Sequence, residues 1–232
     1  MVIFDLDFAL NMVIFDLDFA LNLIPLMLKY LIVTLKLSFL SLIFALILGV
    51  ILAIIVDAKV PILSFIAKVY VSFFRGTPLI AQLFFIYFGL IQIIPMLKGL
   101  SAFTSAVIAL SLNAAAYCSE SLRGAISSID KGQMEAAYAF GMTYYQGMTR
   151  IVLPQAIKVA IPTLVNVFAD IVKGSSLAFT IGVTEIMATA QSEAAAQYKF
   201  LEAFTCVILV YWALSGIISI IQSRLEKVFS KA

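Results

Sequence analysis

Residues 132–141 read Gly-Gln-Met-Glu-Ala-Ala-Tyr-Ala-Phe-Gly, a short, mildly polar segment in a chain that is otherwise strongly apolar. Alanine and glutamate favour a helix, and Gly141 is a residue type at which helices commonly end. A second short helical pattern follows as far as Arg150. A helix face of small alanines is shallow, so a groove on another protein can approach it closely. The segment predicts either a short helix offered to a partner or an ordinary connector between larger helices.

The composition of the chain indicates a membrane protein. Of its 232 residues, 63% are hydrophobic and 12% are charged, with a mean hydropathy of +1.11. A soluble domain carries roughly 25% charged residues. The net charge of +2 is too small to indicate nucleic-acid binding. We therefore predict an all-α, polytopic membrane protein.

The sequence offers no catalytic or metal-binding constellation. It has no histidine, and Cys118 and Cys206 lie inside apolar runs, where cysteine more often packs than forms a disulfide or binds metal. No glycine is followed by lysine, so the phosphate-binding loop of ATPases is absent. We expect no enzymatic activity, no metal site and no cofactor bound by the chain itself.

The chain starts with a perfect repeat, because residues 1–11, MVIFDLDFALN, recur at 12–22. We interpret residues 1–22 as a duplicated start, either an artefact or an amphipathic segment on the membrane surface. The aspartates in both copies and the lack of a basic leader argue against a secretory signal. Residues 23–232 are then one transmembrane domain.

Four uncharged runs are long enough to cross about 30 Å of hydrocarbon, which takes roughly 20 helical residues. They are residues 37–56, 76–97, 99–119 and 203–223. A fifth region, residues 151–184, contains Lys158, Asp170 and Lys173 and two prolines. A charged span faces protein or water rather than lipid. Five spans put the two termini on opposite sides of the membrane.

Basic residues indicate the orientation, because lysine and arginine are enriched in cytoplasmic loops. If the N-terminus is outside, Lys29, Lys98 and Lys199 are the only basic residues on the external side that are not near a span boundary. Most other basic residues then face the cytoplasm. This predicts a membrane protein with a cytoplasmic C-terminus and residues 132–141 inside.

Two local patterns place polar residues close to the second and third spans. Residues 74–79, FRGTPL, put Arg75 and a turn before Pro78, a plausible helix entry. The spacing of Asn113, Glu120 and Arg123 allows all three to share one helix face. The simpler interpretations are a helix start with an interfacial arginine and a helix end held by an ion pair.

A third pattern lies in the charged fourth span, at residues 170–177, DIVKGSSL. Asp170 and Lys173 can pair along a helix that Gly174 then breaks. A broken, charged helix at membrane depth often lines an aqueous path. The simpler alternative is an interfacial loop.

Together with residues 135–141 and 151–156, these patterns resemble the membrane-spanning permease subunit of an ABC importer for polar amino acids. That family carries E-A-A, a glycine four residues after the second alanine, and then I-x-L-P, which here are Glu135, Ala136, Ala137, Gly141 and 151–154. The amino-acid branch adds F-R-G-T-P-L and A-A-Y-x-x-E-x-x-R-G-A-I, present in full at 74–79 and 115–126.

The chain departs from the family's K-D-T-S-L at residues 173–177, where glycine and serine replace aspartate and threonine. The resemblance runs from about residue 23 to the C-terminus. Within the branch, residues 75–82 and 127–133 are most similar to cystine-type permeases.

The resemblance implies the type I importer permease fold in a bacterial cell membrane, with five transmembrane helices and a coupling loop at about 130–154. It implies that the short helix docks on a cytoplasmic ABC ATPase dimer, which binds ATP and Mg. It also implies a second permease copy, identical or homologous, and an external solute-binding protein.

Three groups of residues follow as candidate sites. The coupling residues are Glu135, Ala136, Ala137, Gly141 and Pro154, and the structural or gating residues are Arg75, Pro78, Glu120, Arg123 and Lys173. Polar residues in apolar helices predict a substrate path near Asn113, Asn166 and Glu185.

Two other classes of protein compete with this hypothesis. An ion-coupled secondary amino-acid transporter, or a small channel, usually shows internal repeats and buried acids. The chain has no convincing inverted repeat. The second alternative is a purely structural membrane subunit.

Overall fold

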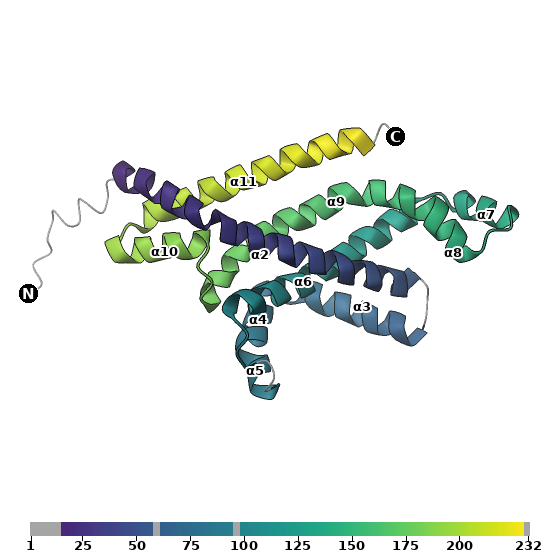
Figure 1. Cartoon of the computed structure of the whole chain (residues 1–232), viewed down its shortest axis with the longest axis horizontal. Helices are drawn as coiled ribbons and strands as arrows, with labels where there is room; N and C mark the ends of the chain where they lie inside the picture. Colours follow the sequence, from purple (N-terminus) through teal and green to yellow (C-terminus); the bar gives the residue numbers. More distant parts are fainter. Residues whose placement is uncertain (1–14, 58–60, 95–97, 230–232) are drawn as a thin grey trace, which may run out of the picture.

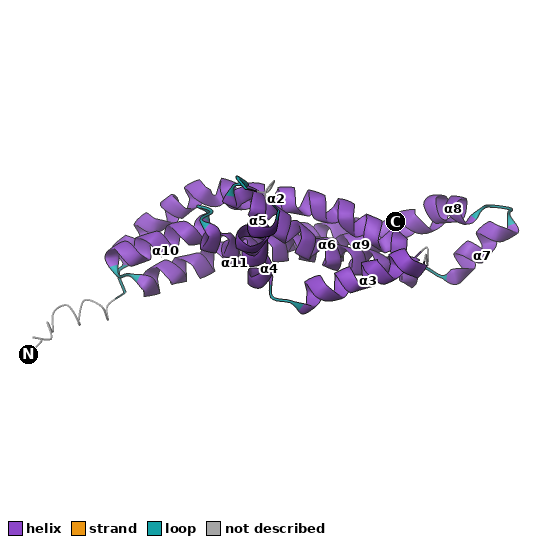
Figure 2. Cartoon of the chain, turned by 90° about the horizontal axis from the view of Figure 1, so that it is seen from below, coloured by secondary structure: helices purple, strands orange, loops and turns teal. Residues whose placement is uncertain are grey.

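The computed structural model describes residues 15–57, 61–94 and 98–229. These residues are almost entirely helical and include no strand. Figures 1 and 2 show an elongated bundle, with the start of α2 at one end and the α7–α8 hairpin at the other. Four helices of the described chain are long and apolar enough to cross a membrane, or five if the bent pair formed by α3 and the helices after it counts as one span.

The first span is much longer than residues 37–56. Helix α2 runs without interruption over Leu17–Asp57 and passes through Pro25. It can do so because Lys29 and Lys36 lie on its exposed side, while residues three or four apart, such as Leu23 and Met27, are buried.

The boundary expected between residues 22 and 23 falls inside α2. Residues 17–22 form the first turns of α2, and Phe19 and Ala20 are buried with Ile186 and Ala203 in a core cluster. Because these apolar side chains are buried in the core, residues 17–22 belong to the transmembrane domain and do not form a separate surface helix. The first copy, residues 1–11, lies outside the described residues.

The second span is not a straight helix over 76–97. Helix α3 covers Pro61–Gly76, and α4 (Leu79–Phe84), the π-helical segment Phe85–Gly89 and α5 (Leu90–Ile93) continue at 109° to it. The break falls at Thr77 and Pro78, because proline has no N–H with which to continue a helix. The expected helix entry at Pro78 is confirmed, and residues 95–97 lie outside the described residues.

The third span packs closely against the first. Helix α6, Ala102–Ser128, continues nine residues past the expected end and carries small buried residues that face α2. At Gly49 of α2 an added Cβ would lie 2.6 Å from the Cβ of Cys118. Small residues at such a crossing let two membrane helices approach closely. Cys118 and Cys206 are both free and buried, as expected of packing residues.

The coupling region and the fourth span follow α6. The chain continues through α7 (Lys131–Ala139), α8 (Tyr144–Gly147) and a π-helical segment, Met148–Val152, into α9 (Leu153–Gly174). Pro162 lies inside α9 without ending it. As expected, the α-helix stops at Gly174, and a 3-10 helix, Ser175–Ile181, completes this region.

Two helices complete the bundle. The short helix α10, Ile186–Gln197, was not expected, and α11 spans Phe200–Phe229. A side-chain ion pair of 3.3 Å between Asp16 and Lys199 ties the start of α2 to the turn before α11. The Phe19 amide and Lys199 hold the pKa of Asp16 below its ordinary value.

The contact at Gly49 gives a test of the α2–α6 packing. Gly49→Ala should destabilise the protein by about 1–3 kcal/mol, because the new methyl forces the two helices apart. Gly124→Ala on α6 is the control, since nothing lies within 4 Å of its Cβ position. The control should be neutral or stabilising by up to about 1 kcal/mol. Denaturation in detergent micelles measures both, and equal stability of the two variants would contradict the packing argument.

Candidate functional site

The α7–α8 hairpin is defined by local capping interactions. Asp130 Oδ1 accepts a 2.6 Å hydrogen bond from the Gly132 amide at the start of α7. Gly141 has a φ of +76°, a left-handed conformation that glycine adopts without strain. Thr143 and Gln146 then form a reciprocal capping box that starts α8. The helix and stop predicted from residues 132–141 are thus confirmed.

The two arms of the hairpin pack through one small residue from each. Ala137 is 1% exposed. An added Cβ at Gly147 would lie 3.1 Å from the Ala137 Cβ and 2.7 Å from the Met134 Sδ. Ala137 therefore holds the hairpin together and does not belong to its outer surface. Glu135 and Ala136 are exposed and remain available to a partner.

The outer surface of the hairpin is aromatic. Phe140 is 85% exposed and Tyr145 is 75% exposed, with Tyr138 about half exposed. These side chains lie on the part of the chain that projects farthest from the bundle (Figure 1). Exposed aromatic residues are over-represented where proteins bind one another.

The hairpin is joined to the bundle at two places. The Tyr144 hydroxyl donates a hydrogen bond to the carboxylate of Asp57, the last residue of α2. Pro154 lies in the first turn of α9, which directly follows the π-helical segment Met148–Val152, so the second arm of the hairpin runs into α9 without a break. The hairpin is therefore bonded to the end of α2 and continuous with the start of α9.

The break between α3 and α4 is closed by two side-chain amides. The Phe74 carbonyl accepts hydrogen bonds from Gln82 Nε2 at 3.0 Å and from Asn113 Nδ2 at 3.1 Å. Asn113 Nδ2 also donates to Gln82 Oε1 at 3.0 Å. We call Phe74, Gln82 and Asn113 the carbonyl clamp. A carbonyl freed at a helix break needs a donor where water is scarce, and the clamp supplies it.

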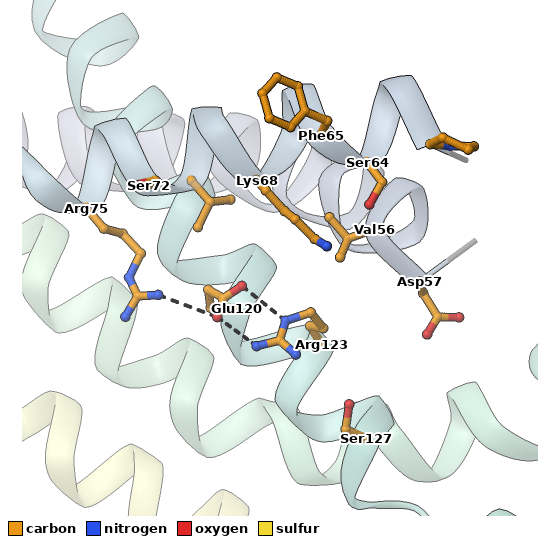
Figure 3. Close-up of a pocket in the computed structure, with 12 residues that line it drawn as sticks. Val56, Asp57, Ser64, Phe65, Lys68, Ser72, Arg75, Glu120, Arg123 and Ser127 are labelled. Carbon is orange, nitrogen blue, oxygen red and sulfur yellow. Dashed lines mark hydrogen bonds and ion pairs between the residues drawn. The ribbon is translucent and has the colours of Figure 1, made fainter. Parts of the chain in front are cut away.

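An ion-pair network lies beside the clamp. Glu120 accepts hydrogen bonds from Arg123 Nε and Nη2 at 3.1 and 2.9 Å, and its Oε2 lies 3.5 Å from Arg75 Nη1 (Figure 3). The Glu120–Arg123 pair predicted from sequence is confirmed, and Arg75 joins it from α3. The guanidinium of Arg75 also lies 5.6 Å from the ring centre of Tyr117. These residues border an open pocket of about 920 Å³ between the end of α2, α3 and α6.

A smaller cavity of about 220 Å³ lies between α4, α6 and α9. Its polar lining comes from Asn113, Tyr117 and Asp170, and its other lining residues are apolar. Asp170 Oδ1 lies 2.8 Å from Lys173 Nζ, so the predicted ion pair forms. The cavity thus offers an amide, an aromatic ring and a carboxylate next to a cation.

The three residues expected along the substrate path are not brought together. Asn113 lines the small cavity, whereas Asn166 is exposed on α9 and is not part of that lining. Glu185 is fully buried at the start of α10. Its carboxylate accepts hydrogen bonds from the Ala188 amide, the Tyr211 hydroxyl and the Thr34 hydroxyl at 2.9, 2.9 and 3.4 Å. Glu185 therefore fastens α10 to α2 and α11.

A comparison with protein families assigns the chain. Residues 45–231 match the family described as "Binding-protein-dependent transport system inner membrane component". The chain belongs to this family. It is the membrane-spanning permease subunit of an ATP-driven ABC importer and not itself an enzyme.

Individual relatives agree with this assignment. The permease is 52% identical to the "Probable amino-acid ABC transporter permease protein PatM" of Vibrio harveyi over 83% of this chain and 86% of that protein. It is 41% identical to the "L-cystine transport system permease protein TcyB" of Bacillus subtilis over 82% of this chain and 81% of that protein. Its fold matches the "Crystal structure of an amino acid ABC transporter with histidines" with a TM-score of 0.81 and 33% identity, over 88% of this chain and 94% of that chain.

Sequence reasoning missed several residues that shape this permease. Gln82 is a lone amide in an apolar run just after Pro78, and that isolation was its only signal. Gly147 carried no signal, because its role depends on a contact with the opposite arm. The same is true of the bond between Asp57 and Tyr144, residues 87 positions apart.

The carbonyl clamp can be tested by removing its amides. Gln82→Leu should destabilise the permease by about 1–3 kcal/mol, because it leaves the Phe74 carbonyl short of a donor. Gln92→Leu is the control, since Gln92 is exposed and, among the described residues, bonds only to the Phe88 carbonyl of the preceding π-helical segment. Thermal unfolding in micelles measures both. A Gln82→Leu variant as stable as the control would show that the break does not need the clamp.

Proposed function

We propose that this permease imports a polar amino acid, with the α7–α8 hairpin docked on a cytoplasmic ABC ATPase. The observation that carries the coupling role is the hairpin surface itself. Glu135 and Ala136 are exposed beside Phe140 and Tyr145 at one end of the molecule. An exposed aromatic surface with one carboxylate suits a protein groove better than water or lipid.

The proposed mechanism separates the energy source from the pathway. ATP and Mg bind on the two ATPase subunits, and their closure moves the docked hairpin as a unit. Because the hairpin is bonded to α2 through Tyr144 and continues into α9, its movement shifts both helices, and α9 lines the small cavity. The spans then alternate between outward and inward openings as populations shift.

The orientation follows from the hairpin. An ATPase is cytoplasmic, so the α7–α8 end of the bundle faces the cytoplasm and the start of α2 faces outside. The C-terminal end of α11 then lies on the cytoplasmic side, toward the hairpin end (Figure 1). The basic residues of the chain support the same orientation.

The proposed partners complete the pathway. Few residues of α11 are buried, and large apolar side chains such as Trp212 and Ile208 are exposed. Lipid covers part of this surface, and a second permease copy, identical or homologous, is needed to enclose a path. The family's dependence on a binding protein supports an external receptor that delivers the solute.

The substrate class is supported by the small cavity and by the relatives. Asp170 lines the cavity, and Lys173, outside the lining, is paired with it, so both signs of charge lie close together and complement the amino and carboxylate groups of an amino acid. The relatives are named for amino acids, one of them L-cystine, while the solved relative contains histidines. We propose a polar amino acid, with cystine the first to test.

The coupling role is tested by two substitutions in the hairpin. Glu135→Lys, or Gly141→Leu, should uncouple uptake from ATP hydrolysis without preventing insertion, because the first reverses a docking charge and the second strains the left-handed turn. Vesicles holding the permease, its ATPase and its binding protein report uptake and hydrolysis together. The matched control is Lys131→Arg, which keeps the charge at the start of α7. Normal uptake by both hairpin variants would remove the coupling assignment.

The cavity is tested by neutralising its acid. Asp170→Asn should raise the KM for amino-acid uptake at least about tenfold, because the substrate ammonium loses a charged partner. Glu193→Gln on α10 is the control away from the cavity.

Uptake by the permease alone, driven by an ion gradient without any ATPase, would favour the secondary transporter instead.

A further inference from the structure

We propose that the pocket between α2, α3 and α6 binds the phosphate headgroup of an anionic phospholipid, whose acyl chain lies along the outer face of α3. Three cations line this pocket, Lys68, Arg75 and Arg123, against two carboxylates, Asp57 and Glu120. The pocket holds about 920 Å³, enough for a headgroup and the glycerol next to it.

The two carboxylates leave the lining of the pocket with one net positive charge. Arg75 and Arg123 share the single carboxylate of Glu120, and Asp57 is engaged by the Tyr144 hydroxyl. Lys68 makes no hydrogen bond or ion pair within the described part of the chain, and Figure 3 shows its ammonium pointing into the pocket. The hydroxyls of Ser64, Ser72 and Ser127 add uncharged donors for phosphate oxygens.

A second, apolar hollow continues from this pocket over α3. It measures about 440 Å³ and shares Phe65, Lys68 and Ser72 with the first. Its remaining lining comes from Val69 and Phe73, both about half exposed. A cationic pocket that runs into an apolar groove fits a molecule with an anionic head and a hydrocarbon chain.

The place of the pocket in the membrane agrees with this occupant. The end of α2 and the start of α3 lie at the same end of the bundle as the hairpin (Figure 1). The inference rests on the proposed orientation at this one step, which puts the pocket in the cytoplasmic leaflet. Anionic lipids attract basic residues there, and basic pockets between spanning helices bind their headgroups.

The test measures lipid bound to the full-length permease purified in detergent. Native mass spectrometry counts retained phosphatidylglycerol, with phosphatidylcholine as the zwitterionic comparison. Phosphatidylglycerol should be retained and phosphatidylcholine should not. Lys68→Gln should weaken retention about fivefold, the effect of one lysine near an anionic headgroup. Ser72→Phe should also weaken it, because the ring fills the passage between the two hollows while leaving every charge in place.

The control and the opposing outcomes separate this site from its alternatives. Lys227→Gln, near the end of α11, removes a lysine outside the pocket and should leave retention unchanged. Equal retention by wild type and Lys68→Gln, or of both lipids, would overturn the proposal. Displacement of the lipid would overturn it as well. Displacement by millimolar inorganic phosphate would indicate a site for a free anion, and displacement by the transported amino acid would indicate a substrate path. Displacement on dimerisation would indicate a contact surface between permease copies. Because binding is read without ATPase or transport, failure of the proposed function would be seen separately in the vesicle assay.

Discussion

A backbone carbonyl in hydrocarbon must find a donor, and this requirement shapes the centre of the permease. When α3 stops at Gly76, the Phe74 carbonyl is left without its usual helical amide, and Gln82 and Asn113 replace it. The two amides come from α4 and α6, so closing the break also fixes where these helices meet. Leu79 and Asn113, held in this way, form part of the wall of the small cavity.

The same geometry explains the ion-pair network. Because α3 ends at the clamp, Arg75 is held one residue beyond Phe74, within reach of Glu120 on α6. The side chains of the network are partly exposed, so its energetic contribution is small, and removing one such pair would cost at most about 1 kcal/mol. The network matters mainly because it holds the guanidinium groups of Arg75 and Arg123 at the pocket between α2, α3 and α6.

The sequence predicted what depends on neighbours along the chain. The helix over 131–139, its end near Gly141, the helix entry at Pro78 and the pairs Glu120–Arg123 and Asp170–Lys173 follow from short spacings. It did not predict what depends on contacts between distant segments. Ala137 faces inward because Gly147 lies opposite, and Glu185 is buried because Thr34 and Tyr211 reach it from two other helices.

Helix boundaries failed for a related reason. We predicted each span as an uncharged run of residues, so a charged residue ended the predicted span. A helix can continue through a charged residue whose side chain lies on its exposed face. The lysines at 29 and 36 therefore shortened the predicted first span by about half, and the charged residues after 119 shortened the third. Helix α10 escaped notice because its alanine-rich sequence is neither apolar enough to span nor interrupted enough to be a loop.

The unbroken length of α2 has a consequence for signalling across the membrane. Its 41 residues make a rod of about 60 Å, roughly twice the hydrocarbon thickness. One end is bonded to the hairpin arm at Tyr144, and the other touches the segment just before α11 through Asp16 and Lys199. A stiff rod attached at both ends acts like a lever. Binding of the receptor on one side of the bilayer could thus change the contacts of the ATPase on the other side through α2. The solute path would take no part in this coupling.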